Sequence, residues 1–150
     1  MIETHTFETN RENTESTIDK TEIVNFLHRH LEQYGDPEED IAGALAYCMG
    51  ENHKPGGLLI TARQKSTQEL AGVCIINKTG MSGYIPENIL VYIATDSRLR
   101  GQGIGKKIMQ EAISHTEGDI ALHCEPDNPA FHLYDKLGFR SKYLEMRLKK

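Results

Sequence analysis

Arg100-Gly101-Gln102-Gly103-Ile104-Gly105 is the stretch that decides how this chain is interpreted. An apolar run at 89–94 leads into it and an amphipathic run at 104–114 follows, so the pattern predicts a strand, a glycine-rich turn and a helix. In that arrangement several backbone N–H groups and the positive end of the helix point at one position. Glycine allows a ligand to approach the backbone closely and tolerates positive φ. The stretch therefore predicts an anion-binding site suited to a diphosphate.

The spacing of the glycines excludes two common phosphate-binding loops. A dinucleotide-binding G-x-G-x-x-G loop needs a third glycine where this chain has Lys106. A P-loop needs four residues between its first glycine and its Gly-Lys-Ser/Thr end, whereas this chain has three, and Lys107 stands at the hydroxyl position. The spacing that fits is Arg/Gln-x-x-Gly-x-Gly/Ala. Basic side chains add positive charge nearby, namely Arg98, Arg100, Lys106 and Lys107.

A second motif lies further along the chain. Residues 128–139 read Asn-Pro-Ala-Phe-His-Leu-Tyr-Asp-Lys-Leu-Gly-Phe. Asn128 and Pro129 are suited to begin a short helix, and Gly138 is suited to end it. Together with the glycine loop, this segment resembles the general N-acetyltransferases, the GNAT superfamily. In that family an Asn opens the fourth helix, a Tyr follows six residues later, here Tyr134, and Gly-Phe closes the helix.

The resemblance covers residues 87–139, about a third of the chain, and implies a fold and a cofactor. The fold would be α+β, with a mixed, mostly antiparallel sheet of six or seven strands, a splayed parallel central pair and helices on both faces. Residues 1–150 would form a single N-acetyltransferase domain. Acetyl-CoA, as co-substrate, would lie between the splayed strands, its pantetheine pairing with one strand and its pyrophosphate with the loop. The implied cofactor-binding residues are Ile93, Ala94, Thr95, Arg100, Gly101, Gln102, Gly103, Ile104, Gly105, Lys106 and Asn128.

The composition favours a single compact domain and excludes several classes of function. The chain has 150 residues, 38% of them apolar, which is enough for one core. A net charge of −5 argues against nucleic acid or an anionic membrane as the main partner and is compatible with a cationic amine. The sequence shows neither a membrane-spanning run nor the apolar part of a signal peptide. The three scattered cysteines, Cys48, Cys74 and Cys124, indicate reduced thiols in a cytoplasmic protein without a bound metal.

Periodicity and turn residues predict the remaining elements. The predicted strands cover 1–9, 58–63, 70–77, 87–94, 119–124 and 139–148, and the predicted helices cover 19–34, 37–49, 104–114 and 129–137. The second and third strands should form an antiparallel hairpin, and the fourth and fifth should be parallel. Residues 10–17 should be a loop. Since twelve residues follow Gly138 where the family often has two strands, we expect a short sheet edge, or else a strand supplied by a partner chain.

Transfer to an amine requires a base, because an amine that is charged at neutral pH has no lone pair to attack with. Many GNAT members place a Glu nine residues before the Arg/Gln of the loop, and here Val91 stands at that position. The histone-modifying branch uses a Glu thirteen residues before it, which here is Glu87. Period-two alternation puts Glu87 on one strand face with Ile89, Val91 and Ile93. Glu87 is therefore the candidate base, with His123 and water as alternatives.

Two further roles complete the expected chemistry. Backbone N–H groups of the splayed strand would stabilise the developing oxyanion, and Tyr134 would protonate the leaving thiolate. Tyr92 is predicted to be a core residue on the opposite strand face from Glu87. The predicted function is acetyl transfer from acetyl-CoA to a primary amine, in a small molecule or a peptide or protein, by a monomer or homodimer. The alternative is a non-catalytic acyl-CoA-binding or regulatory module, which Val91 favours.

Overall fold

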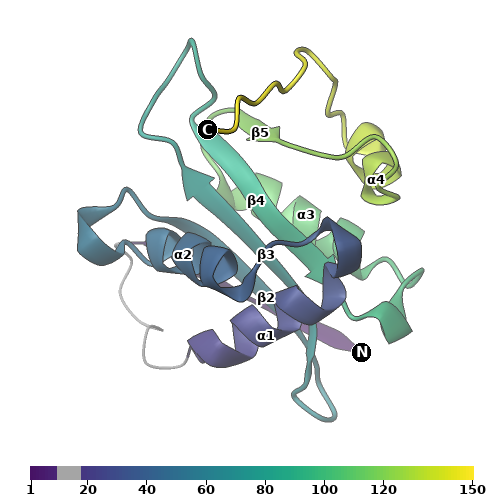
Figure 1. Cartoon of the computed structure of the whole chain (residues 1–150). Coiled ribbons are helices and arrows are strands. Elements are labelled where there is room, and N and C mark those ends of the chain that lie inside the picture. Colours follow the sequence, from purple (N-terminus) through teal and green to yellow (C-terminus); the bar gives the residue numbers. More distant parts are fainter. Residues whose placement is uncertain (10–17) are drawn as a thin grey trace.

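The computed structural model describes residues 1–9 and 18–150, which form one mixed sheet with helices against both faces (Figure 1). The sheet has the order β1-β2-β3-β4-β5, with antiparallel pairing except between β4 and β5, which are parallel. The strands are β1 (Ile2–Glu8), β2 (Gly57–Gln64), β3 (Leu70–Lys78), β4 (Asn88–Thr95) and β5 (Ile120–Leu122). The helices are α1 (Lys20–His30), α2 (Glu38–Cys48), α3 (Ile104–His115) and α4 (Ala130–Lys136). Short 3₁₀ turns lie at Glu32–Tyr34, Glu51–His53 and Ser97–Leu99.

The α+β class, the β2–β3 hairpin and the parallel β4–β5 pair confirm the prediction, but the strand count does not. Among the described residues the sheet has five strands, not six or seven. The predicted strand over 139–148 is absent, and residues 140–150 are all exposed. The alternation of apolar and polar residues that predicted this strand indicates only which side chains would share a face. A strand also needs backbone hydrogen bonds to a neighbouring strand, and residues 140–150 have none. The predicted loop at 10–17 lies outside the described residues.

Two cores hold the layers together. The first core joins α1 and α2 to one sheet face, and the second joins α3 to the other, with α4 packed at its rim. Every residue of β3 except Lys78 is buried, as expected for a central strand covered on both sides. The close approach of α3 depends on Gly72 in β3, because a Cβ there would lie 2.4 Å from Ile108 Cδ1.

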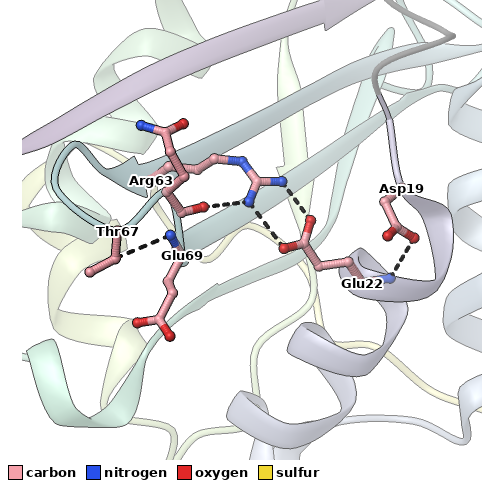
Figure 2. A network of polar contacts seen from close by, with 6 residues as sticks. Asp19, Glu22, Arg63, Thr67 and Glu69 are labelled. Carbon is pink, nitrogen blue, oxygen red and sulfur yellow. Dashed lines mark hydrogen bonds and ion pairs between the residues drawn. The ribbon is translucent and has the colours of Figure 1, made fainter.

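Helix α1 begins where its sequence indicates and is tied to the β2–β3 hairpin. The Asp19 side chain caps it by accepting a hydrogen bond from the Glu22 N–H at 3.1 Å. Glu22 in turn binds the guanidinium of Arg63 through both carboxylate oxygens, at 2.5 and 3.0 Å (Figure 2). This bidentate pair fixes the first turn of α1 against the end of β2. Its placement makes Glu22 structural and leaves the opposite end of α1 beside the glycine loop.

Strand β4 contains a bulge at Val91. Ile75 pairs with Tyr92 and Ile76 pairs with Leu90, so that Val91 has no partner in β3. Val91 and Tyr92 consequently both pack against the first core, whereas Ile93 packs against the second. The prediction that Val91 and Ile93 share a face is therefore wrong, because one extra residue reverses the alternation.

Candidate active site

Beyond the bulge, β4 has one free edge. The parallel ladder with β5 holds only three pairs and ends at Leu90 and Leu122. From Tyr92 to Thr95, β4 is paired with β3 on one side, while no described strand borders the other. An unpaired edge presents backbone donors and acceptors to an extended ligand. Ile93, Ala94 and Thr95 lie on this free edge.

A buried carboxylate positions the chain between β4 and the glycine loop. Asp96 is 2% exposed and accepts hydrogen bonds from the Arg98 N–H at 2.9 Å and from its guanidinium at 3.1 and 2.7 Å. These bonds from Arg98 lower the pKa of Asp96 to about 2. Since Asp96 already neutralises Arg98, that arginine contributes little free charge to the loop. Its role here is to fix the turn at Ser97–Leu99.

The glycine loop presents a run of unpaired backbone donors. The N–H groups of residues 101–106 donate to no other described residue, and the first bond inside α3 runs from the Lys107 N–H to the Gly103 oxygen at 3.0 Å. Gly101 and Gly103 have φ of +82° and +79°, and a Cβ at either would meet nothing within 4 Å. Positive φ explains these two glycines, and no described atom outside the immediate chain neighbours occupies the space where a side chain at either position would begin.

The side chains around the loop are partly engaged elsewhere. Arg100 donates to the carbonyl oxygen of His30, the last residue of α1, at 3.1 Å. It also pairs with Glu32, just after that helix, at 3.3 Å. Lys107 Nζ donates to the Ile2 carbonyl oxygen at 3.2 Å. Lys106 is exposed, and its ammonium group pairs with no other described residue. The backbone amides, with Lys106, are thus the groups that remain available to an anion.

Helix α4 packs beside the start of α3 and brings the second motif to the first. A Cβ on Gly105 would lie 3.4 Å from Leu133 Cδ2 in α4 and 3.7 Å from Thr95 Cγ2 in β4. Asn128 Oδ1 accepts from the Ala130 N–H at 2.9 Å and so starts the helix, one residue later than predicted. The two motifs recognised in the sequence therefore converge at the end of β4.

Tyr134 lies on the buried side of α4. It is 8% exposed, and its ring meets that of Phe139 edge to face at 5.9 Å between centroids. Its hydroxyl makes no hydrogen bond to another described residue. Burial raises the pKa of Tyr134, and the nearby thiols Cys124 and Cys74 raise it further. Tyr134 directly follows Leu133, which packs against the second core and lies next to Gly105 of the loop.

Glu87 is held at the opposite end of β4. Its Oε1 accepts from the Asp119 N–H at 2.7 Å and its Oε2 from the Gly83 N–H at 3.1 Å. These two backbone bonds lower the pKa of Glu87. Gly118 permits the contact, since a Cβ there would lie 2.5 Å from Oε1. The carboxylate thus joins the start of β5 to the loop before β4.

Two tyrosines tie the α1–α2 connection to both sides of the splayed pair. Tyr92, next to the bulge, donates its hydroxyl to Asp36 Oδ2 at 2.5 Å. Tyr34 donates to the Asp127 carbonyl oxygen, beyond β5, at 3.1 Å. Burial, followed by the bond to Asp36, raises the pKa of Tyr92. Residues 34–36 therefore bridge the region where β4 and β5 part.

Comparison with known proteins decides the family. The model of the acetyltransferase (GNAT) family matches residues 21–139. The chain belongs to the GNAT acetyltransferase family.

Solved GNAT structures share the fold at low sequence identity. The ribosomal-protein-S18-alanine N-acetyltransferase from Escherichia coli is 18% identical, with a TM-score of 0.67 over 95% of this chain and 80% of that one. Glucosamine-6-phosphate N-acetyltransferase from Arabidopsis thaliana is 16% identical, with a TM-score of 0.59 over 99% and 98%. The aminoglycoside N-acetyltransferase AAC(6')-Iy in complex with CoA is 11% identical, with a TM-score of 0.68 over 100% and 95%. These similarities support the GNAT fold.

The structure brings some of the predicted GNAT site residues together and separates others. The loop at 101–106, the 93–95 segment and α4, the helix that carries Tyr134 and that Asn128 caps, meet at the end of β4. Glu87 lies about 16 Å from Tyr92 along an extended strand and is engaged by the backbone. His123 is exposed just after β5. No helix in the described parts of the chain is long and apolar enough to cross a membrane.

Sequence reasoning missed three features of this site. Asp36 precedes Pro37 and satisfies the sequence rules for capping α2, but the helix has no side-chain cap and Asp36 binds Tyr92 instead. Tyr92 was predicted to be core, yet it is only half-buried. The role of the buried Asp96 in fixing the turn was not predicted, because in the sequence it is only a carboxylate two residues before Arg98.

Proposed function

We propose that this GNAT-family chain transfers the acetyl group of acetyl-CoA to a primary amine, directly and within a ternary complex. The observation that carries the proposal is the run of unpaired N–H groups at 101–106, at the start of α3. Such donors at a helix N-terminus suit a pyrophosphate, whose negative charge the helix dipole also favours. The open space above Gly101 and Gly103 fits the same ligand.

The free edge of β4 supports the placement of the pantetheine arm. Its amide groups would pair with the backbone of Ile93, Ala94 and Thr95 as an added strand does. The cap of α4 uses only the side-chain oxygen of Asn128, so its amide NH₂ remains available as a donor. We propose that this NH₂ contacts the pantetheine arm from the side opposite β4. The bulge at Val91 supports an oxyanion site, because it takes backbone groups out of the regular ladder.

Tyr134 is the proposed acid for the leaving thiolate. Its raised pKa keeps the phenol protonated at neutral pH, which a proton donor requires. Its hydroxyl has no partner among the described residues, so the proton is available for transfer. Rigid placement on α4 supports the same role.

For the acceptor's proton we favour water over Glu87. Both oxygens of Glu87 are hydrogen-bonded and its pKa is lowered, which makes it a weaker base. We assign Glu87 to holding β5 in place. The acceptor amine, in a small molecule or a peptide or protein, would approach past Tyr92 and Asp36, where the carboxylate attracts a cation. The free thiols of Cys48, Cys74 and Cys124 support a reducing, cytoplasmic location for the proposed enzyme.

The decisive experiment measures CoA binding and turnover separately. Calorimetry should show that CoA and acetyl-CoA bind far more tightly than NAD or ATP. Free-thiol release from acetyl-CoA should then depend on an added amine, across a panel of small amines, lysine peptides and peptides with free N-termini.

The alternative, a non-catalytic acyl-CoA-binding module, rests on Val91 at the usual base position and on the engaged carboxylate of Glu87. Tight CoA binding with no thiol release from any amine would establish that alternative. Absence of CoA binding would overturn both functions.

A further inference from the structure

The last residue of α1, His30, contacts the turn that leads into the glycine loop. Its Nδ1 accepts a hydrogen bond from the Ser97 N–H at 3.2 Å, so the end of α1 and the turn after β4 lie side by side (Figure 1). The carbonyl oxygen of His30 also accepts from the Arg100 guanidinium at 3.1 Å. One residue of α1 thus holds the chain at both ends of 97–100, directly before the unpaired amides of 101–106.

His30 and Asp96 hold this turn from two sides. The Asp96 N–H donates to the Ala71 oxygen at 2.9 Å, which ties the start of the turn to β3. The Asp96 carbonyl oxygen accepts from the Leu99 N–H at 2.9 Å and closes the turn on itself. The Ser97 N–H is left to His30, so this bond is what attaches the turn to α1.

Packing fixes the ring of His30. The ring is half-buried and lies against the ring of Phe26, with 4.5 Å between the centroids. Phe26 is itself a buried residue of the first core, so the imidazole is held by a rigid neighbour. Because an imidazole nitrogen accepts only when it carries no proton, the proton of neutral His30 lies on Nε2.

Charged side chains from α1, from the chain just after it and from the segment after β4 lie near the imidazole. They are Arg29, Glu32, which pairs with Arg100, and Asp96, Arg98 and Arg100. Burial lowers the pKa of His30 from the ordinary 6.5, Asp96 opposes this, and the three arginines lower the pKa further. The imidazole is therefore neutral at neutral pH, and its charged form would face a surplus of positive charge.

Protonation would change Nδ1 from an acceptor into a donor. Two N–H groups would then point at each other across the 3.2 Å contact, and the bond to Ser97 would be lost. The pKa of His30 is lowered in the folded chain, so the contact is complete above the ordinary 6.5 and is lost as pH falls through the lowered value. The attachment of the turn to α1 thus depends on pH in the mildly acidic range.

We propose that neutral His30 is a positioning residue for the glycine loop, and that its protonation releases the Ser97 turn and weakens the binding of CoA. The effect on CoA rests on the proposed function. A released turn leaves the amides of 101–106 less ordered, and a ligand that must order them binds less tightly. The added positive charge would attract phosphate, an effect of opposite sign that salt screens. Binding is therefore compared at physiological ionic strength.

Two substitutions of His30 separate the hydrogen-bond acceptor from the ring. His30→Asn places an uncharged side-chain oxygen near the position of Nδ1, so the Ser97 N–H keeps an acceptor at every pH. His30→Phe keeps an aromatic ring against Phe26 and removes the acceptor. The bond from Arg100 goes to the backbone and stays in both variants. Circular dichroism checks that each variant keeps its fold.

Equilibrium dialysis with acetyl-CoA, from about pH 8 to about pH 5, measures the affinity of each protein. As pH falls, the wild type should lose affinity roughly three- to ten-fold relative to His30→Asn, as the loss of one hydrogen bond predicts. Titration of the ligand's own phosphates cancels in this ratio. His30→Phe should bind more weakly than His30→Asn by the same factor at every pH.

The matched control is His28→Asn, on the same helix, because His28 faces Glu38 of α2. This variant should keep the pH dependence of the wild type. A ratio of wild-type to His30→Asn affinity that stays constant with pH would overturn the proposal. A wild-type affinity that rises relative to His30→Asn in acid would also overturn it, because the charge would then outweigh the contact.

NMR of the free protein tests the contact without CoA. The Ser97 amide and the amides of 101–106 should shift with the same midpoint as the His30 ring, and the ring ¹⁵N shifts should place the neutral proton on Nε2. A Ser97 amide that does not follow the His30 ring would overturn the proposal whatever the affinity for acetyl-CoA. If acetyl-CoA bound at no pH, the proposed function would fail, and the Ser97 amide would still decide whether His30 holds the turn.

Discussion

The hydroxyl of Tyr92 donates to Asp36 Oδ2 at 2.5 Å and so joins the bulge of β4 to the connection between α1 and α2. The two residues are 56 positions apart in the sequence. The bond fixes the distance between the strand proposed to carry the thioester and the wall proposed to meet the acceptor. The proposed acceptor site therefore has a structural determinant that the proposed CoA site does not share.

Tyr92→Phe should raise the KM for the acceptor roughly three- to ten-fold and leave CoA affinity unchanged, because one hydrogen bond to a carboxylate is lost on the acceptor side. Steady-state kinetics with a good acceptor and calorimetry with CoA measure the two effects. The control is Tyr47→Phe, which removes a comparable bond to the Lys78 carbonyl oxygen at 2.5 Å. An equal loss of CoA affinity in Tyr92→Phe would show that the bond supports the whole fold instead.

Gly103→Asp should weaken CoA binding by roughly a hundred-fold or more, because it puts a side chain and a negative charge where the pyrophosphate is proposed to lie. Calorimetry measures the affinity. Gly83→Asp is a close control, since Gly83 also has φ of +77° and open space around its Cβ but lies in the loop before β4. Both variants carry the same backbone strain, so equal CoA affinities would contradict the placement of the ligand.

Tyr134→Phe should lower kcat by about 10- to 1,000-fold with little change in CoA affinity, because a positioned proton donor is removed and the apolar volume is kept. The raised pKa of Tyr134 also predicts the pH dependence of the wild-type rate. Activity that needs the neutral phenol falls only as pH rises above the ordinary tyrosine range. Stopped assays of thiol release across pH measure both effects. The exposed Tyr143 provides the control variant, Tyr143→Phe. A Tyr134→Phe variant with wild-type kcat would assign this residue to packing alone.

Glu87→Gln should lower the melting temperature and reduce kcat/KM by one constant factor at every pH. The amide offers a single acceptor oxygen where the carboxylate uses two, so the start of β5 loses a bond. Thermal melts and a pH profile of kcat/KM measure this, with Glu39→Gln on the exposed side of α2 as control. If the reduction in kcat/KM relative to wild type disappears at high pH, where the amine is already neutral, Glu87 is the base.

Asp96→Asn should lower the free energy of unfolding by about 1–2 kcal/mol at neutral pH. The expected loss is small because the guanidinium of Arg98 is exposed, and solvent screens its attraction to Asp96. The folded pKa of about 2 lies below the usual 3.8, so the stabilisation is present above about pH 4 and is lost as pH falls toward 2. Urea unfolding at several pH values measures the difference between variant and wild type. Asp135→Asn, in an exposed pair with Arg140, should have little effect. A difference independent of pH would show that the charge of Asp96 is not what stabilises the turn.

Much of this fold can be predicted from local patterns. The strand, loop and helix around 100–105 follow from glycine spacing and helical periodicity, and α3 begins at Ile104 as predicted. Asn128 could be recognised because a cap acts on its own neighbours. These signals need no knowledge of distant residues.

The rest depends on contacts that local patterns do not encode. The bulge at Val91 arises from the register with β3, and nothing in the apolar run marks it. Asp36 satisfies the rules for a helix cap, but Tyr92 competes for its carboxylate from a remote strand. Glu87 directly precedes β4, where the family pattern allows a base, and only the folded chain brings the Gly83 and Asp119 N–H groups to it.

The donors of the glycine loop belong to the main chain, and this makes the proposed recognition of the phosphates a property of shape. Exchanging Gln102 or Lys106 for other residues changes side chains and leaves every amide in place. Gly101 and Gly103 cannot be replaced as freely, because the backbone path of the loop depends on their positive φ. A binding surface of this kind tolerates extensive drift of the surrounding sequence, so chains with little sequence in common can present the same set of donors.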